Sequence, residues 1–174
     1  RYGINDVSSL LEQVEAKLSI KLAPQQKRAV YQALENGVMV LTGGPGTGKT
    51  TIVKALISLF DSVCERVVLA APTGRAAKRM SEATGHEAKT VHRMLEMERT
   101  QNGESRFNRN GKTPLDESVV IVDEASMLDL FLMEALVRAL KRGARLVLIG
   151  DSDQLPSVGA GNVLRDIIDS GRFS

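Results

Sequence analysis

The segment GGPGTGKT, residues 43–50, places four glycines and a proline around one lysine and matches the pattern G-x-x-x-x-G-K-[ST] without a mismatch. A phosphate group needs several hydrogen-bond donors at short range. Glycines let successive backbone N–H groups point inward, and a following helix adds its free N-terminal amides. The pattern predicts a phosphate-binding loop in which Lys49 reaches the β- and γ-phosphates and Thr50 holds Mg²⁺, with further contacts from Gly44, Pro45, Gly46, Thr47, Gly48 and Thr51.

A glycine-rich turn without chemical role is the alternative for this segment. Because glycine makes up about 7% of residues on average, the four fixed positions should coincide by chance in well under about one chain in a hundred of this length. An apolar run at 38–41 precedes the segment and a helical apolar pattern at 52–60 follows it. This context favours the phosphate-binding interpretation.

Two carboxylates follow a second apolar run, at residues 119–122. Ligands gather at the C-terminal ends of strands in open parallel sheets. We therefore expect Asp123 to hold Mg²⁺ together with Thr50, and Glu124 to orient and deprotonate an attacking water. The alternative is an acidic pair that caps a helix beginning near Ser126, because carboxylates favour helix N-termini.

A third polar segment, GDSDQLP at residues 150–156, follows the apolar run at 146–149. Its glutamine, Gln154, is predicted to sense the γ-phosphate. A polar loop with Asx-type turns is the alternative.

These segments must be positioned by an alternation of strands and helices. Four β-branched runs, at 38–41, 67–70, 119–122 and 146–149, lack polar alternation, as in strands covered on both faces. Helical patterns lie at 24–36, 52–60, 76–83, 91–95 and 128–140. The alternation predicts an α/β fold, a parallel sheet with helices on both faces.

Composition limits the class of protein. The 174 residues are 43% hydrophobic, and a chain of this length buries roughly 70% of its unfolded surface. The 23 basic and 21 acidic side chains nearly balance, so the overall charge does not indicate any class of binding partner. One cysteine excludes an internal disulfide, and no apolar run approaches the roughly 18 residues of a membrane span. We expect a cytoplasmic protein without membrane contact, and a piece of a longer chain.

The motifs resemble those of the superfamily 1 DNA helicases, most closely the RecD-like group. Residues 43–51 resemble motif I, 71–80 motif Ia, 119–126 motif II and 148–161 motif III; 89–95 resembles the stretch that follows Ia. LAPQQKRAV, at 22–30, resembles the motif whose glutamine, here Gln26, contacts adenine. The resemblance covers residues 22–168. It implies a RecA-like P-loop NTPase domain that uses ATP and Mg²⁺ in an ATP-dependent DNA helicase of recombination or repair, moving 5′ to 3′.

The resemblance also sets expectations for domains and partners. Such helicases have two RecA-like domains, and the second domain's motifs, including an arginine that reaches the γ-phosphate, have no counterpart in this sequence. We expect residues 22–174 to form domain 1A, which works with a second RecA-like domain of the same parent chain. Residues 1–21 are expected to form an amphipathic helix that links to a missing region and packs on a missing neighbour.

In this family the segments between the nucleotide motifs contact DNA. Hydroxyls, helix N-terminal amides and a few cations are typical contacts to a phosphate backbone. The expected partner is single-stranded DNA or a duplex–single-strand junction, and the matching residues are Pro72, Thr73, Arg75, Thr90 and His92. Solvated cations and a satisfied polar histidine are the alternative.

Residues 96–118 are polar, contain Asn-Gly twice and are too long for a plain connection. The resemblance implies a 1B-like insertion reduced to a hairpin that parts the duplex, with Phe107, Arg106 and Arg109 as its pin. A disordered surface loop is the alternative.

Two other functions use the same phosphate loop. An ATP-gated DNA-binding or switch module would not hydrolyse ATP productively, and the expected base Glu124 argues against it. A small-molecule P-loop kinase would need a substrate lid, which is not evident, and the segments DEAS and GDSDQLP are foreign to that class.

Overall fold

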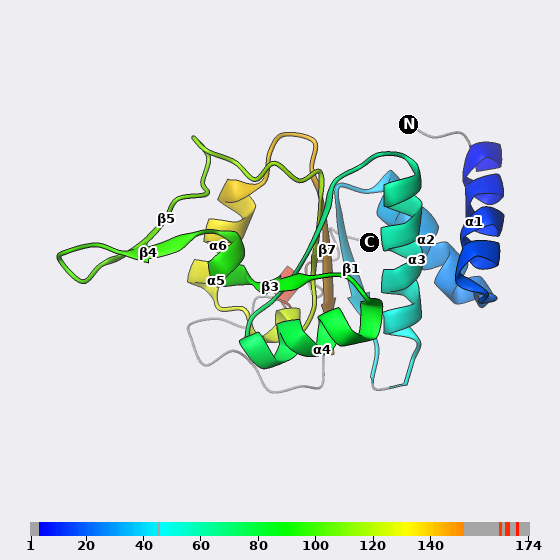
Figure 1. Ribbon diagram of the computed structural model, residues 1–174, viewed down its shortest axis with the longest axis horizontal. Coiled ribbons are helices and arrows are strands. Elements are labelled where there is room, and N and C mark those ends of the chain that lie inside the picture. Colours follow the sequence, from blue (N-terminus) through cyan, green and yellow to red (C-terminus); the bar gives the residue numbers. More distant parts are fainter. Residues whose placement is uncertain (1–3, 45, 152–163, 165, 168–169, 171–174) are drawn as a thin grey trace.

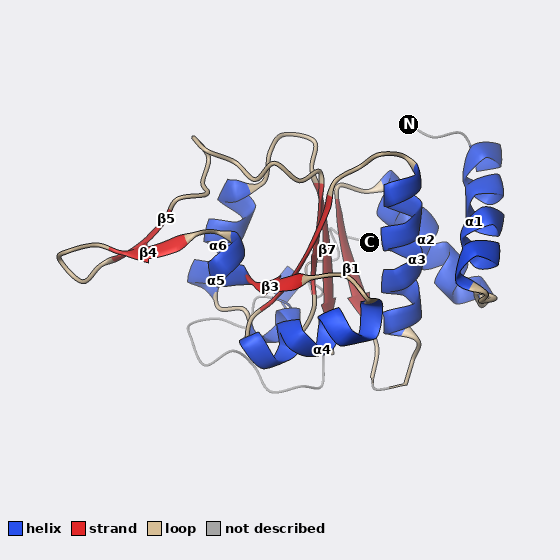
Figure 2. Ribbon diagram, in the orientation of Figure 1, coloured by secondary structure: helices blue, strands red, loops and turns tan. Residues whose placement is uncertain are grey.

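The computed structural model describes residues 4–44, 46–151, 164, 166–167 and 170. Its centre is a five-stranded sheet in the order β1-β7-β6-β2-β3, and all its pairings are parallel (Figures 1 and 2). The strands are β1 (Val38–Thr42), β2 (Val67–Ala71), β3 (Ala88–Thr90), β6 (Val119–Val122) and β7 (Arg145–Gly150). The α/β fold and the four predicted strands are confirmed. The additional strand, β3, has the sequence AKT and so lacks the apolar run that marks the others.

Helices cover both faces of this sheet because successive strand residues point to opposite sides. In β6, Ile121 belongs to one buried cluster, whereas Val120 and Val122 belong to the other. The first cluster lies under α1 (Ile4–Leu18), α2 (Pro24–Glu35) and α3 (Lys49–Ser62). The second lies under α5 (Val91–Met94) and α6 (Leu130–Ala139). Burial on both faces explains why the strands read as continuous apolar runs.

Helix α1 packs into the same core as the sheet. Its residues Val7, Leu11 and Val14 are buried, and the helix contacts α3. Glu15 accepts hydrogen bonds from the Leu22 backbone at 2.7 Å and from the Lys27 ammonium at 3.0 Å, which joins α1 to α2. The bond from Lys27 lowers the pKa of the Glu15 carboxyl. The expectation that this helix packs on a missing neighbour is therefore wrong for its buried side.

The helix predicted at 128–140 is present as one helix, α6 (Leu130–Ala139), which begins two residues later than predicted. A short 3-10 turn, η1 (Ala125–Met127), follows β6, and α6 begins only at Leu130. Asp129 caps α6 because its carboxylate accepts a hydrogen bond from the Leu132 N–H at 2.7 Å. Leu128 lies between the two elements, extended and fully buried. Asp129 is an N-cap within the apolar pattern, so the helix is shorter than predicted, but the face that it buries is the same.

A second, two-stranded antiparallel sheet projects from the domain. It consists of β4 (Met97–Arg99) and β5 (Ser105–Phe107), which form a hairpin within the polar segment 96–118. Gly103 has a φ of 81°, so the first Asn-Gly pair supplies the turn of the hairpin.

Within the described part of the chain, every helix is too short or too polar to span a lipid bilayer.

Candidate functional site

The turn between β1 and α3 has the backbone geometry of an anion-binding loop. Gly46 and Gly48 have φ values of 77° and 80°, in the left-handed region where a side chain would be strained. Gly48 is also the N-cap of α3, so the free amides of that helix face the turn. Thr47 closes the loop by donating its hydroxyl hydrogen to the Gly44 carbonyl at 2.8 Å.

Lys49, the first residue of α3, is half-buried and lies across this loop. Its ammonium group donates to the Gly43 carbonyl, at the opposite end of the turn. An ammonium held across a turn that also offers backbone amides would meet a bound phosphate directly. Thr50 and Thr51 follow in the first turn of α3. Pro45 lies outside the described residues.

Gln26, expected to contact adenine, lies beside the turn between β1 and α3. Its side-chain carbonyl accepts a hydrogen bond from the Ala23 N–H at 2.9 Å and so caps α2. Its amide nitrogen faces Gly48, where an added Cβ would collide with it. Gly48 is therefore required by its φ, whereas the end of the Gln26 side chain could move aside for a Cβ.

The acidic pair lies at the C-terminal end of β6, as predicted. The Asp123 N–H donates to the Ala70 carbonyl at 2.9 Å, which ties the end of β6 to β2. Its carboxylate accepts a hydrogen bond from the Glu124 N–H at 2.8 Å. Glu124 has a φ of 52°, a left-handed conformation that is uncommon for a residue other than glycine and clusters at functional sites.

The loop and the acidic pair meet in one pocket. Lys49 and Thr50 from α3 line it together with Asp123 and Glu124. Strand β7 pairs with both β1 and β6, so these residues leave the same edge of the sheet. Helix α4 (Gly74–Thr84) closes the pocket, and its Arg79 forms an ion pair with Glu124. This pairing was not predicted, because nothing in the local sequence links two residues 45 positions apart. Gln154 lies outside the described residues.

The expected DNA contacts gather at a neighbouring part of that edge. Pro72 and Thr73 form the turn after β2, and Arg75 lies exposed in the first turn of α4. Strands β2 and β3 pair with Ala71 opposite Thr90, which brings the N-termini of α4 and α5 to adjacent strand ends.

Two threonines on this edge act as helix N-caps. Thr73 accepts a hydrogen bond from the Ala76 N–H at 3.2 Å, and Thr90 accepts one from the Arg93 N–H at 3.1 Å. A capping hydroxyl accepts through its oxygen and keeps its own hydrogen available. Both side chains can therefore still donate to a phosphate oxygen.

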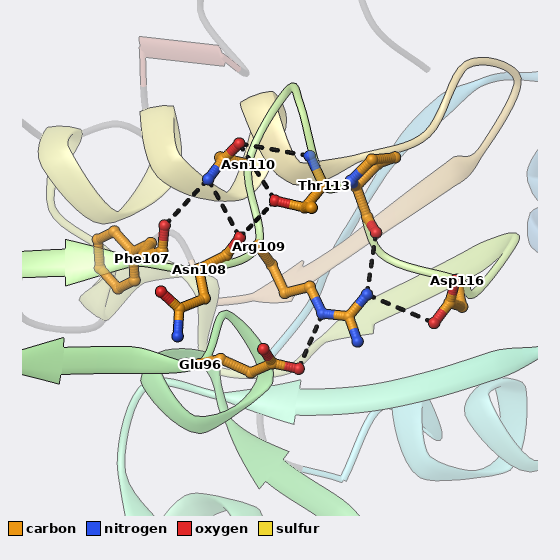
Figure 3. Close-up of polar contacts among 8 residues, drawn as sticks. Glu96, Phe107, Asn108, Arg109, Asn110, Thr113 and Asp116 are labelled. Carbon is orange, nitrogen blue, oxygen red and sulfur yellow. Dashed lines mark hydrogen bonds and ion pairs between the residues drawn. The ribbon is translucent and has the colours of Figure 1, made fainter.

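Arg109 lies at the base of the hairpin, not at its tip. Arg109 donates to the Glu96 carboxylate at 2.8 Å, to the Pro114 carbonyl at 3.2 Å and to the Asp116 carboxylate at 3.4 Å (Figure 3). The hydrogen bond to Glu96 raises the pKa of Arg109 above its ordinary value. The expectation that Arg109 belongs to an exposed pin is therefore wrong.

Phe107 also lies at the base of the hairpin. Its ring centroid is 6.3 Å from that of His92 and 5.7 Å from that of Phe131, so it connects α5 to α6. The tip, residues 100–104, has the sequence TQNGE and carries no aromatic side chain. Of the three residues expected in the pin, only Arg106 is exposed.

The comparisons with known proteins agree on one group. A family profile described as an AAA domain matches residues 26–160. The RecBCD enzyme subunit RecD of Mycobacterium tuberculosis is 44% identical over 168 aligned residues, which cover 83% of this chain and 28% of that subunit. The ATP-dependent RecD2 DNA helicase of Deinococcus radiodurans is 45% identical over 140 residues, which cover 80% of this chain and 19% of that helicase. The chain thus spans less than a third of these relatives.

Solved structures share the fold. Bacteroides sp. Pif1 in complex with ADP-AlF4 has a TM-score of 0.58 and 25% identity, covering 87% of this chain and 36% of that chain. Bacteroides Pif1 bound to single-stranded DNA has a TM-score of 0.59 and 23% identity, with the same 87% of this chain covered.

Proposed function

This chain belongs to the AAA domain family, within its RecD-like helicase group, and on that premise we propose that it is the ATP-binding motor domain of an ATP-dependent DNA helicase. The observation that carries the proposal is the single pocket lined by Lys49, Thr50, Asp123 and Glu124. Residues 22–174 act as RecA-like domain 1A, and a second RecA-like domain of the full-length protein completes the motor. Its work belongs to DNA recombination or repair, with 5′ to 3′ movement, in the cytoplasm.

The predicted site residues divide into those that bind ATP and those that act in its hydrolysis. Lys49 and the backbone amides of residues 44–51 hold the phosphates, and Gln26 contacts adenine. Glu124 orients the attacking water and takes its proton, and Gln154 senses the γ-phosphate. The Lys49 ammonium is bonded to the Gly43 carbonyl, and a phosphate oxygen would compete with that carbonyl for it.

The pocket also fits a magnesium ion. The Thr50 hydroxyl and the Asp123 carboxylate are hard oxygen donors that line the same space. Among the described residues no group of three or more His, Cys, Asp or Glu forms a cage. Magnesium in nucleotide sites needs none, because one or two carboxylates, the phosphates and several waters complete its shell. The bound ion would neutralise charge on the β- and γ-phosphates.

We expect single-stranded DNA to accelerate ATP hydrolysis by the full-length protein, and ATP to drive the unwinding of a duplex with a single-stranded tail. Both assays should include Lys49→Ala, which removes a cation from the transferred phosphoryl group and should lower kcat by about 10² to 10³-fold or more. A switch module would bind ATP with negligible turnover. A small-molecule kinase would turn over ATP without responding to DNA. Either result would refute the helicase proposal.

The edge formed by Pro72, Thr73, Arg75, Thr90 and His92 contacts the phosphate backbone of single-stranded DNA or of a duplex–single-strand junction. Arg75→Ala should weaken binding by a similar factor for all sequences and reduce the salt slope by roughly 0.7. Binding measured from low to high salt tests this. Arg142→Ala, an exposed cation at the opposite sheet edge, is the matched control. An unchanged slope for Arg75→Ala would identify a merely solvated side chain.

The β4–β5 hairpin is the 1B-like element that meets the duplex, held rigid by Arg109. Arg109→Gln should leave DNA-stimulated ATP hydrolysis intact and reduce unwinding about tenfold, since displacing a positioned group by about 1 Å can cost up to ~10²-fold. Arg138→Gln, which removes an exposed arginine of neighbouring α6, is the control. If hydrolysis and unwinding fall together, Arg109 supports the fold and not the hairpin.

A further inference from the structure

The side chain of Glu124 is already occupied in this structure. Its Oε1 accepts a hydrogen bond from the Arg79 guanidinium, and the two side chains form an ion pair. Among the described residues, no other side chain is bonded to this carboxylate. A base must offer a carboxylate oxygen to the attacking water. The pair with Arg79 withdraws one of the two oxygens and turns the group toward α4.

The ion pair is placed where it can be exchanged. Both side chains line the pocket, and that of Glu124 is 21% exposed whereas that of Arg79 is 61% exposed. Pairs with one solvated partner are weak and readily broken by a competing charge. Arginine binds phosphate through parallel hydrogen bonds, so a DNA phosphate is a strong competitor for this guanidinium.

Helix α4 carries both the residues expected to contact DNA and the arginine that is paired with Glu124. Its N-cap Thr73 and its first-turn Arg75 belong to the proposed DNA edge, and Arg79 lies four residues beyond Arg75. Residues four apart lie on one face of a helix, so the two guanidinium groups are neighbours. Arg75 has no carboxylate partner among the described residues.

We propose that Arg79 is a positioning residue that holds Glu124 away from the attacking water until a DNA phosphate at the N-terminal turn of α4 draws the guanidinium away. DNA binding then frees the base, and ATP hydrolysis becomes dependent on DNA. This inference rests on the proposed helicase function, because it requires both a hydrolytic role for Glu124 and DNA at α4.

The test uses the full-length protein and measures ATP hydrolysis with no DNA and with increasing oligothymidylate. Arg79→Gln should raise the DNA-free kcat by about two- to fivefold, the range in which exposed ion pairs act. At saturating DNA its kcat should match the wild type, while the DNA concentration at half-stimulation should increase. The ratio of stimulated to DNA-free rates should therefore fall. Arg79→Lys keeps a charge and should restore part of that ratio.

Two further variants isolate the ion pair. Lys78→Ala removes the adjacent cation of α4, which pairs with Glu82 at 3.9 Å and not with Glu124, and it should behave as the wild type. In Glu124→Gln/Arg79→Gln, the DNA-free rate should equal that of Glu124→Gln alone, because the gain must pass through the Glu124 carboxylate.

The outcomes separate this proposal from the function on which it rests. If DNA stimulates the wild type but Arg79→Gln leaves the DNA-free rate unchanged, the positioning role is wrong and the helicase function stands. If Arg79→Gln and Arg79→Lys lower kcat equally with and without DNA, Arg79 acts directly in hydrolysis and the proposal is overturned. If DNA does not stimulate the wild type, both proposals fail.

Discussion

The isolated 174-residue chain should bind ATP yet hydrolyse it about 10³ to 10⁵-fold more slowly than the full-length protein, and it should not unwind DNA. Negative charge must be stabilised on the phosphoryl group as it is transferred, and in helicases of this class an arginine of the second RecA-like domain supplies part of that stabilisation. Lys49 and the loop amides remain in the isolated chain, so ATP binding persists. Unwinding needs two domains that grip the strand alternately, and one domain cannot do so alone.

Purified residues 1–174 and the full-length protein should be compared for nucleotide affinity, DNA-stimulated turnover and strand separation. Circular dichroism of the isolated chain is the control that it folds. Rates like those of the full-length protein would place the catalytic arginine within this chain. Arg79 would then be the first residue to test for that role, since it lines the same pocket as Lys49 and Glu124.

Glu124→Gln in the full-length protein should slow hydrolysis by about 10² to 10⁴-fold while Mg-ATP still binds. Glutamine keeps the size of the side chain but cannot take a proton from water. Asp123, which shares the pocket with Thr50, is unchanged in this variant, so the proposed metal contact persists. Single-turnover hydrolysis and a nucleotide-binding titration measure the two effects separately.

The matched control is Glu82→Gln, which neutralises an exposed carboxylate of α4 that lies outside the pocket lining. It should leave both quantities unchanged. If Glu124→Gln lost affinity for Mg-ATP and kept its rate of hydrolysis, the roles proposed for Glu124 and Asp123 would be wrong.

Local patterns were the most reliable part of the prediction. The residues of β1, β2, β6 and β7 were recognised because strands buried on both faces need apolar side chains at every position. The start of α2 at Pro24 was also predicted, because proline is favoured in the first turn of a helix.

The errors concern elements whose surroundings decide their structure. Strand β3 has a polar sequence and exists because β2 offers it an edge to pair with. Helix α1 could bury its apolar side on any apolar surface, and the structure shows that α3 provides it. Phe107 and Arg109 looked like an exposed pin, yet the first packs on Phe131 and the second bonds to Glu96.

The amino-acid sequence by itself determined the chemical content of the site. A phosphate loop is made by consecutive backbone amides, and an acidic pair at a strand end needs only an apolar run before it, so both are encoded within about ten residues. Only the tertiary structure decided which side chains meet across the pocket. Arg79 reaches Glu124 because pairing of β2 with β6 and packing of α4 bring together residues 45 positions apart. Such contacts depend on how whole helices and strands are placed, and the spacing of residues within one segment does not predict that placement.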